Sequence, residues 1–277
     1  MFAFTKAGKD WNEDACYVCK NFAFVLDGET TLVKKNFSNE QSDAKWCSNW
    51  WANYLKKHLK NKSKTIPEIL KIGTQEYTNA FQNLANGETI QDFPSTMGSI
   101  VRNIDGMIEF YVLGNCPIIF KTKTNHVFLV CDPLNNIVDD INLAIYKDIA
   151  NKENISVLDA RTKYPEYLLD ARLNKNSFGG YFNLCNKVDS IEHGIYNKIS
   201  TEIIDKILIL SDGYTQVFDL MKFITPEELI NNINCKKDAE KIYNKLFIMQ
   251  EEDKNCNQFV RFKIRDDATL VCMEIKK

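Results

Sequence analysis

Two short runs of apolar residues, each followed directly by an acidic turn, give the clearest pattern along the chain. Residues 22–26 run into Asp27-Gly28, and residues 207–210 run into Ser211-Asp212-Gly213. Apolar runs of this length that end at turn residues are typical of strands buried on both faces. The pattern therefore predicts two central strands, each of which carries an aspartate to the rim of the core.

Helical periodicity follows the first of these strands. From Ser42 to Lys60, aromatic and leucine residues recur every three or four positions, which predicts an amphipathic helix with an aromatic core face. A second helix is predicted between Pro67 and Gly87, because proline suits a first helical turn and glycine a C-terminal cap. Helical periodicity returns at residues 216–249.

Short strands are predicted over residues 15–34, 94–131 and 258–275. The Asp105-Gly106 pair between apolar flanks predicts a tight hairpin inside the second range. The first range contains Cys16 and Cys19, whose spacing also occurs in zinc sites. No second pair follows at zinc-ribbon distance, so these cysteines are interpreted as strand residues.

Composition narrows the class of protein. The 277 residues are 44% hydrophobic and suffice for one large domain, which we expect to span 1–277 with a variable insertion at about 133–180. The 35 basic and 37 acidic residues nearly balance, which gives no field for nucleic acid or an anionic membrane. No apolar segment approaches membrane-spanning length, and the odd count of nine cysteines suits reduced thiols, so a soluble cytoplasmic protein is expected.

Four acidic signatures distributed over the whole chain carry the candidate chemistry. They are Asn12-Glu13-Asp14-Ala15, Val25-Leu26-Asp27-Gly28, Leu210-Ser211-Asp212-Gly213 and Arg265-Asp266-Asp267-Ala268-Thr269. Taken singly, each is most simply an ordinary turn or a pair of solvated acids. Carboxylates that converge in a fold repel one another and are costly to desolvate, so a hard divalent cation best explains all four together.

The order of these signatures resembles the PPM (type 2C) family of metal-dependent serine/threonine protein phosphatases, in its bacterial-like branch. The resemblance covers positions 12 to 269. It implies an α+β fold, a four-layer α-β-β-α sandwich of two antiparallel sheets flanked by helices. It also implies two Mn²⁺ or Mg²⁺ ions and hydrolysis of phosphoserine or phosphothreonine in proteins through attack of a metal-bound hydroxide.

The resemblance assigns a role to each acidic position. The catalytic aspartates would be Asp27, which bridges the two metals, and Asp212 and Asp266, which complete the shell of the first metal. The second metal would be held by the carbonyl of Gly28 and, through water, by Glu13. Two further carboxylates, which would orient coordinated water and backbone, are Asp14 and Asp267.

Lys9 stands where the family commonly places an arginine that holds the substrate phosphate. A lysine supplies a point charge without the two-pronged contact of a guanidinium. Capture of phosphate would then be weaker or assisted by another cation such as Arg161 or Arg172. A solvated surface lysine is the equal alternative.

Three other positions depart from the family pattern. Asn115 replaces an acidic residue that helps to hold a third metal in many bacterial members, and an amide brings no charge to such a site. Glu29 stands in the segment where some members have a histidine general acid; it would donate a proton only if its pKa were raised, and a solvent-facing glutamate is the simpler expectation. Asp267 replaces the commoner asparagine and adds one negative charge.

Two other functions stay open at this stage. One is a catalytically silent PPM-like binding or regulatory module, which the substitutions at Lys9, Glu29 and Asn115 favour. The other keeps the metals but hydrolyses a small phosphorylated metabolite, which a fold resemblance does not exclude. The expected partners are a phosphorylated protein substrate and a partner kinase, without nucleic acid or membrane.

Overall fold

The computed structural model describes residues 1–32 and 35–275; positions 33–34 of the predicted strand-and-loop range therefore lie outside the described residues. The strands form two five-stranded antiparallel sheets. In sheet order, the first contains β1 (Phe2–Lys6), β10 (Ala268–Glu274), β9 (Ile204–Leu210), β6 (Ile118–Thr122) and β7 (Val127–Val130). The second contains β2 (Ala15–Val18), β3 (Phe22–Glu29), β4 (Ser95–Ile104), β5 (Met107–Leu113) and β8 (Ile195–Ser200).

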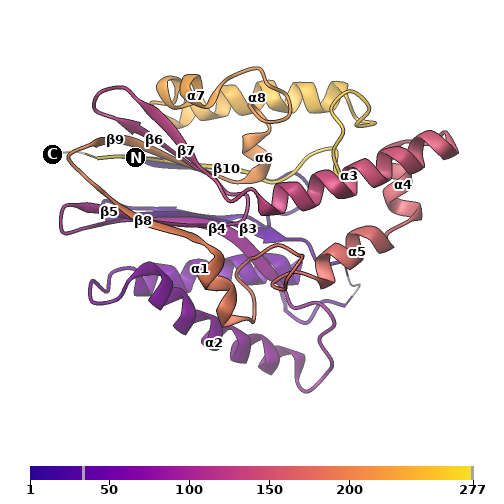
Figure 1. The fold of residues 1–277 in the computed structure, drawn as a ribbon, viewed down its shortest axis with the longest axis horizontal. Coiled ribbons are helices and arrows are strands. Elements are labelled where there is room, and N and C mark those ends of the chain that lie inside the picture. The colour runs from indigo at the N-terminus through magenta and orange to yellow at the C-terminus, as the bar shows by residue number, and fades with distance from the viewer. Residues whose placement is uncertain (33–34, 276–277) are drawn as a thin grey trace.

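The described residues form helices that cover the outer faces of the sheets or extend beyond their ends. They are α1 (Asp43–His58), α2 (Ile66–Ala85), α3 (Leu134–Glu153), α4 (Val157–Lys163), α5 (Glu166–Leu173), η1 (Val188–His193), α6 (Asp212–Thr215), α7 (Pro226–Asn232) and α8 (Lys236–Glu252). Figure 1 shows α1 and α2 under the second sheet and α7 and α8 above the first. The predicted four-layer α-β-β-α sandwich is confirmed.

Alternation along the central strands explains why two sheets pack face to face. In β3, Phe24 and Leu26 point to the cluster formed with α1 and α2, whereas Ala23 and Val25 point to the other sheet. The same alternation in β9 sends Leu208 and Leu210 toward α7 and α8. Both faces of each strand are therefore buried, as their unbroken apolar runs predict.

The helices and the hairpin begin and end close to the predicted residues. Ser42 caps α1 by accepting a hydrogen bond from the Lys45 amide, 3.1 Å away, and Thr65 caps α2 with Pro67 in the first turn. Asp105 and Gly106, both at positive φ, join β4 to β5 as predicted. All nine cysteines are free thiols, and Cys16 lies in β2.

Two predicted ranges are wrong in detail. Residues 216–249 do not form one periodic stretch, because turns precede α7 and separate it from α8. Residues 258–267 are a loop, and only β10 forms in the last predicted strand range. The loop folds around Arg261, whose guanidinium donates to Asp253 Oδ2 at 2.7 Å and to the backbone carbonyl of Phe259 at 2.6 Å. The Phe259 carbonyl therefore bonds to a side chain of its own loop, where a strand would bond to the backbone of a neighbouring strand.

The segment of about 133–180, which the sequence predicts to be a variable insertion and which is called the insertion below, is largely helical. It contains α3, α4 and α5, which lie beyond the ends of the sheets in Figure 1. Tyr146, Val157 and Ala160 form a small apolar cluster there, against Val260 and Phe262 of the C-terminal loop (residues 258–267). In the described part of the chain, no helix combines the length and the apolar character needed to cross a membrane.

Candidate functional site

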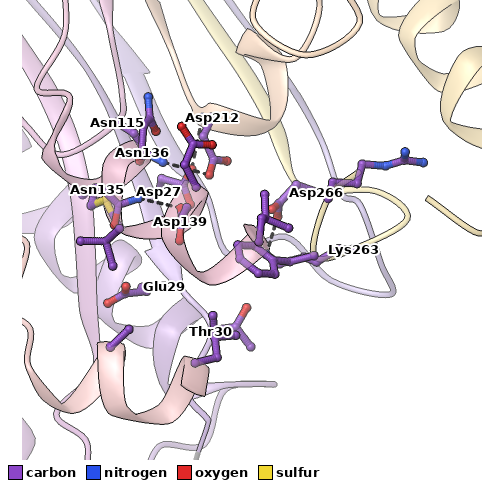
Figure 2. A pocket seen from close by; sticks show the side chains of 18 of the residues that line it. Asp27, Glu29, Thr30, Asn115, Asn135, Asn136, Asp139, Asp212, Lys263 and Asp266 are labelled. Carbon is purple, nitrogen blue, oxygen red and sulfur yellow. Dashed lines mark hydrogen bonds and ion pairs between the residues drawn. The ribbon is translucent and has the colours of Figure 1, made fainter. Parts of the chain in front are cut away.

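Asp27, Asp212 and Asp266 line one cavity of about 390 Å³ at the edge where the two sheets meet. Asp27 lies near the end of β3 in one sheet, and Asp212 follows β9 in the other. Asp266 lies two residues before β10. Figure 2 shows the Asp27 and Asp212 side chains close together and Asp266 on the adjoining wall. The fold thus brings together three carboxylates that lie up to 239 positions apart in sequence.

Glycines allow the strand ends to approach each other this closely. A Cβ at Gly28 would lie 2.4 Å from the carbonyl oxygen of Glu13, and a Cβ at Gly213 would lie 2.0 Å from that of Asp267. Neither contact is tolerable for a side chain. The Asp-Gly pairs therefore serve to bring Asp27 and Asp212 up against neighbouring backbone, beyond their value as turns.

Asp27 and Asp212 are buried side by side in an acidic environment. The Asp212 amide lies 3.4 Å from Asp27 Oδ2, and Asp212 Oδ1 is buried without a hydrogen-bond partner. Burial, followed by repulsion from Asp266, raises the pKa of Asp212 to about 6. Burial, followed by repulsion from Asp212 and Asp14, raises the pKa of Asp27 well above its usual range.

Asp266 has a different environment, because a lysine of the C-terminal loop binds it. Lys263 Nζ lies 2.8 Å from Asp266 Oδ1, which also accepts the backbone amide of Asp267 at 3.0 Å. The Asp266–Lys263 pair appears on one wall of the cavity in Figure 2. Despite the cost of burial, Asp266 and Asp212 raise the pKa of Lys263 above its usual range, so the ammonium stays charged.

Asp14 and Asp267 lie behind the cavity wall. Both oxygens of Asp14 are buried without a hydrogen-bond partner, and burial together with the charge of Asp267 raises its pKa well above the usual range. Asp267 accepts the backbone amides of Gly8 at 2.7 Å and Glu13 at 2.6 Å. It therefore ties the N-terminal segment to the start of β10, as a residue that orients backbone would.

Glu13 is not brought to the cavity. Its carboxylate is buried and accepts hydrogen bonds from Ser42 Oγ and Thr30 Oγ1, both at 2.5 Å, and from the Trp11 indole at 3.2 Å. Gly28 does line the cavity. Of the two groups expected to serve the second metal, the structure places only Gly28 at the site.

The residues around the cavity fit a hard divalent cation. Asp27 and Asp212 supply oxygen ligands only, and the unpartnered oxygens of Asp212 and Asp14 are the signature of missing positive charge. Among the described residues, however, no three acidic, histidine or cysteine side chains gather tightly enough to form a complete metal site. A Mg²⁺ ion held here would have to keep several waters and use few carboxylates.

Lys9, the cation expected to hold the substrate phosphate, is not brought to the cavity. Lys9 is exposed and does not line the cavity. Arg161 and Arg172, the two alternatives, both line it. The guanidinium of Arg172 already has partners, because its Nε lies 3.2 Å from Glu29 Oε1 and its Nη1 donates to the Thr30 carbonyl at 2.9 Å.

Asn115, which stands where the family resemblance expects an acidic residue, forms a hydrogen bond with Asp212. Its Nδ2 donates to Asp212 Oδ2 at 3.2 Å, and its buried Oδ1 has no partner. The amide can thus steady one oxygen of Asp212. It brings no second negative charge to the cavity, which is the consequence that the sequence predicts.

Both expectations for Glu29 are wrong: its side chain is only 7% exposed, and its pKa is lowered. Burial alone would raise the pKa, but the charges of Arg172 and Lys175 outweigh burial, with further help from the hydroxyls of Ser95 and Tyr181. A carboxylate held in this way stays ionised and has no proton to donate. The partners come from the insertion, which the sequence around position 29 does not reveal.

Glu29 connects the end of β3 to the insertion. Besides the two cations, it accepts Ser95 Oγ at 2.5 Å and Asn183 Nδ2 at 2.9 Å. Lys175 in turn donates to Asp92 Oδ1 at 2.5 Å. Glu29 lies two residues after Asp27, and its network holds α5 and the following segment in place as one wall of the cavity.

We expect Glu29→Gln to destabilise the protein by about 3 kcal/mol or more, because removal of one partner leaves buried cations uncompensated. Urea denaturation would measure the loss, and limited proteolysis should show earlier cleavage between residues 172 and 183. Glu192→Gln is the matched control, since Glu192 pairs with Lys71 at the exposed surface. Equal denaturation midpoints for the two variants would contradict this assignment.

Sequence reasoning missed Asp139 and Lys263. Asp139 lies on α3, lines the cavity and accepts a hydrogen bond from Asn135 Nδ2 at 3.1 Å. Burial, then repulsion from Asp212 and Glu29, raises its pKa to about 7. The Asn135/Asp139 spacing of four residues on one helical face was the available signal, but it has no counterpart in the acidic signatures.

Solved structures share this architecture, although no protein-family profile and no curated protein sequence matches the chain. Stp1, a serine/threonine phosphatase of Staphylococcus aureus, superposes with a TM-score of 0.57 at 13% identity, covering 100% of this chain and 94% of that one. The PPM Ser-Thr phosphatase MsPP of Mycobacterium smegmatis gives 0.53 at 13%, covering 99% and 97%. The catalytic domain of PstP, in complex with two manganese ions, gives 0.57 at 11%, covering 99% and 96%.

The chain has the fold of the PPM-type serine/threonine phosphatases. The match extends over nearly the whole of both chains in each case, so the PPM-type fold includes both sheets and both helical layers. At 11–13% identity, the likeness concerns the fold and leaves the chemistry to be argued from the residues of this chain.

Proposed function

We propose that the chain is a metal-dependent phosphatase that hydrolyses phosphoserine and phosphothreonine in proteins at a two-metal centre. The observation that carries the proposal is the meeting of Asp27 and Asp212 from separate sheets at one cavity, with unpartnered carboxylate oxygens between and behind them. Mutual repulsion of this kind is costly unless a cation offsets it. The structural neighbours, one of which holds two manganese ions, support the same interpretation.

Asp27, Asp212 and Asp266, with the carbonyl of Gly28, would hold the metals. The bound cations would neutralise the phosphoryl oxygens and make a water nucleophilic at neutral pH. The chain itself supplies orientation: Asn115 steadies Asp212, and Asp267 fixes the backbone beside Asp266. Residues of the insertion form part of the cavity wall.

We expect metal-stripped protein to be inactive and Mn²⁺ to raise hydrolysis of a phosphoserine or phosphothreonine peptide at least about 100-fold. The factor follows because metals supply several kcal/mol of transition-state stabilisation, at about 1.4 kcal/mol per tenfold in rate. Phosphate release from phosphopeptides and from small phosphate esters, measured side by side, separates a protein phosphatase from a metabolite phosphatase. No turnover with Mn²⁺ between pH 5.5 and pH 9 would overturn the proposal.

A second candidate is a catalytically silent module, favoured by the Lys263–Asp266 ion pair. An ammonium already occupies one carboxylate that the two-metal centre needs. Calorimetric titration of metal-stripped protein distinguishes the two candidates. Tight binding of two Mn²⁺ ions with a raised melting temperature supports the enzyme, whereas weak or absent uptake supports the module.

A further inference from the structure

Arg161 differs from the other arginines of the chain. The other four each form an ion pair with a carboxylate, and they are Arg102, Arg172, Arg261 and Arg265. Arg161, on α4, has no carboxylate within 4 Å among the residues that the structure describes, although it lines the cavity of the carboxylates. A partly buried guanidinium without a counter-ion is costly, so its position calls for an anionic ligand.

The Arg161 side chain is held in place at one edge only. Its Nη1 donates to the carbonyl oxygen of Phe262, and the guanidinium carbon lies 6.0 Å from the centre of the Phe262 ring. Its neighbour Ala160 and its partner Phe262 both belong to the apolar cluster of α3, α4 and the C-terminal loop. Burial lowers the pKa of Arg161, which agrees with a charge that lacks a partner. The remaining N–H groups have no acceptor among the described residues.

The other cations that line the cavity are already neutralised. Lys263 binds Asp266, Arg172 binds Glu29, and Arg261 binds Asp253. Arg161 therefore carries the uncompensated positive charge of the described cavity lining. It comes from α4, whereas Asp27 and Asp212 come from the ends of β3 and β9, and all three line the same cavity.

We propose that Arg161 captures the phosphate group of the substrate, the task that the family resemblance places at Lys9. This inference rests on the proposed phosphatase function. A guanidinium offers two parallel donors that match two phosphoryl oxygens, a geometry that a lysine ammonium lacks. The insertion thus provides a binding group for the reaction, in addition to a wall for the cavity.

The test measures binding of inorganic phosphate to full-length protein by calorimetry, with and without Mg²⁺, alongside KM and kcat for a phosphopeptide. We expect Arg161→Met, which keeps the packing on Phe262, to weaken phosphate binding and raise KM by about 10- to 100-fold, the loss expected for charge-assisted hydrogen bonds. Arg161→Lys should recover part of the loss. Lys163→Ala, an exposed cation two residues further along α4, should match the wild type.

The outcomes separate this inference from the proposed function. If the wild type turns over substrate and Arg161→Met retains both phosphate affinity and KM, the inference fails while the phosphatase stands. If the wild type binds phosphate but hydrolyses no substrate, and Arg161→Met loses the phosphate binding, the proposed phosphatase function fails. The anion site at Arg161 then stands. Loss of phosphate binding on Lys9→Ala alone, or no phosphate binding by the wild type, overturns the inference. Circular dichroism and melting temperature check that each variant folds.

Discussion

Asp27→Asn should lower kcat for an aryl phosphate by about 1,000-fold or more in the presence of Mn²⁺. The Asp27 carboxylate lies beside the Asp212 amide at the point where two cations would share a ligand. An amide of the same shape keeps the local geometry and removes the charge. Several kcal/mol of transition-state stabilisation would be lost with the cations, which at about 1.4 kcal/mol per tenfold corresponds to three orders of magnitude.

The same substitution should stabilise the metal-free protein. Asp27 is repelled by Asp212, Asp14 and Asp266, and an amide relieves that repulsion. Urea denaturation in a chelator would show the gain, so the variant would be inactive yet more stable. Asp105→Asn is the matched control, because Asp105 lies in the exposed hairpin and asparagine before glycine suits that turn. Activity within tenfold of the wild type, or a less stable metal-free variant, would contradict the assignment.

The sequence predicted the parts of the fold that follow from local burial. The apolar runs of β3 and β9 identify strands that are buried on both faces, and their terminal Asp-Gly pairs place Asp27 and Asp212 at the rim. Residues 258–267 were mistaken for strand because the fold of that loop depends on Arg261 and Asp253, which are eight positions apart. A periodic pattern predicts which face of a helix or strand is buried. It does not predict which side chain forms hydrogen bonds with the backbone of a loop.

The candidate site was predictable only in its acidic half. The order of the signatures predicted that Asp27, Asp212 and Asp266 share one site, and the structure places all three at one cavity. The partners of those acids were hidden, because they come from distant segments. Glu29 is paired with Arg172, 143 positions away, and no local pattern could indicate that its pKa is lowered.

Without metal, the protein should become less stable as the pH rises from about 5 to about 8. Asp212 has a pKa of about 6 and Asp139 of about 7 in the folded state, against about 3.9 for an unfolded aspartate. The folded state therefore binds more protons in this interval, and the stability from these groups is present below about pH 4 and lost as the pH rises through 6 and 7. Glu29, whose pKa is lowered, is ionised in both states above about pH 5 and adds no slope.

For Asp212 alone, a displacement of about two units corresponds to on the order of 3 kcal/mol between the ends of the interval. Urea denaturation in a chelator at pH 5, 6, 7 and 8 would measure the decline, and Asp212→Asn should flatten it. Saturating Mg²⁺ should reverse the slope, because cations bind the deprotonated carboxylates and a higher pH then favours the loaded state. Stability that rises with pH in the metal-free protein would mean that these carboxylates do not repel one another, and the cation would then have no charge to offset.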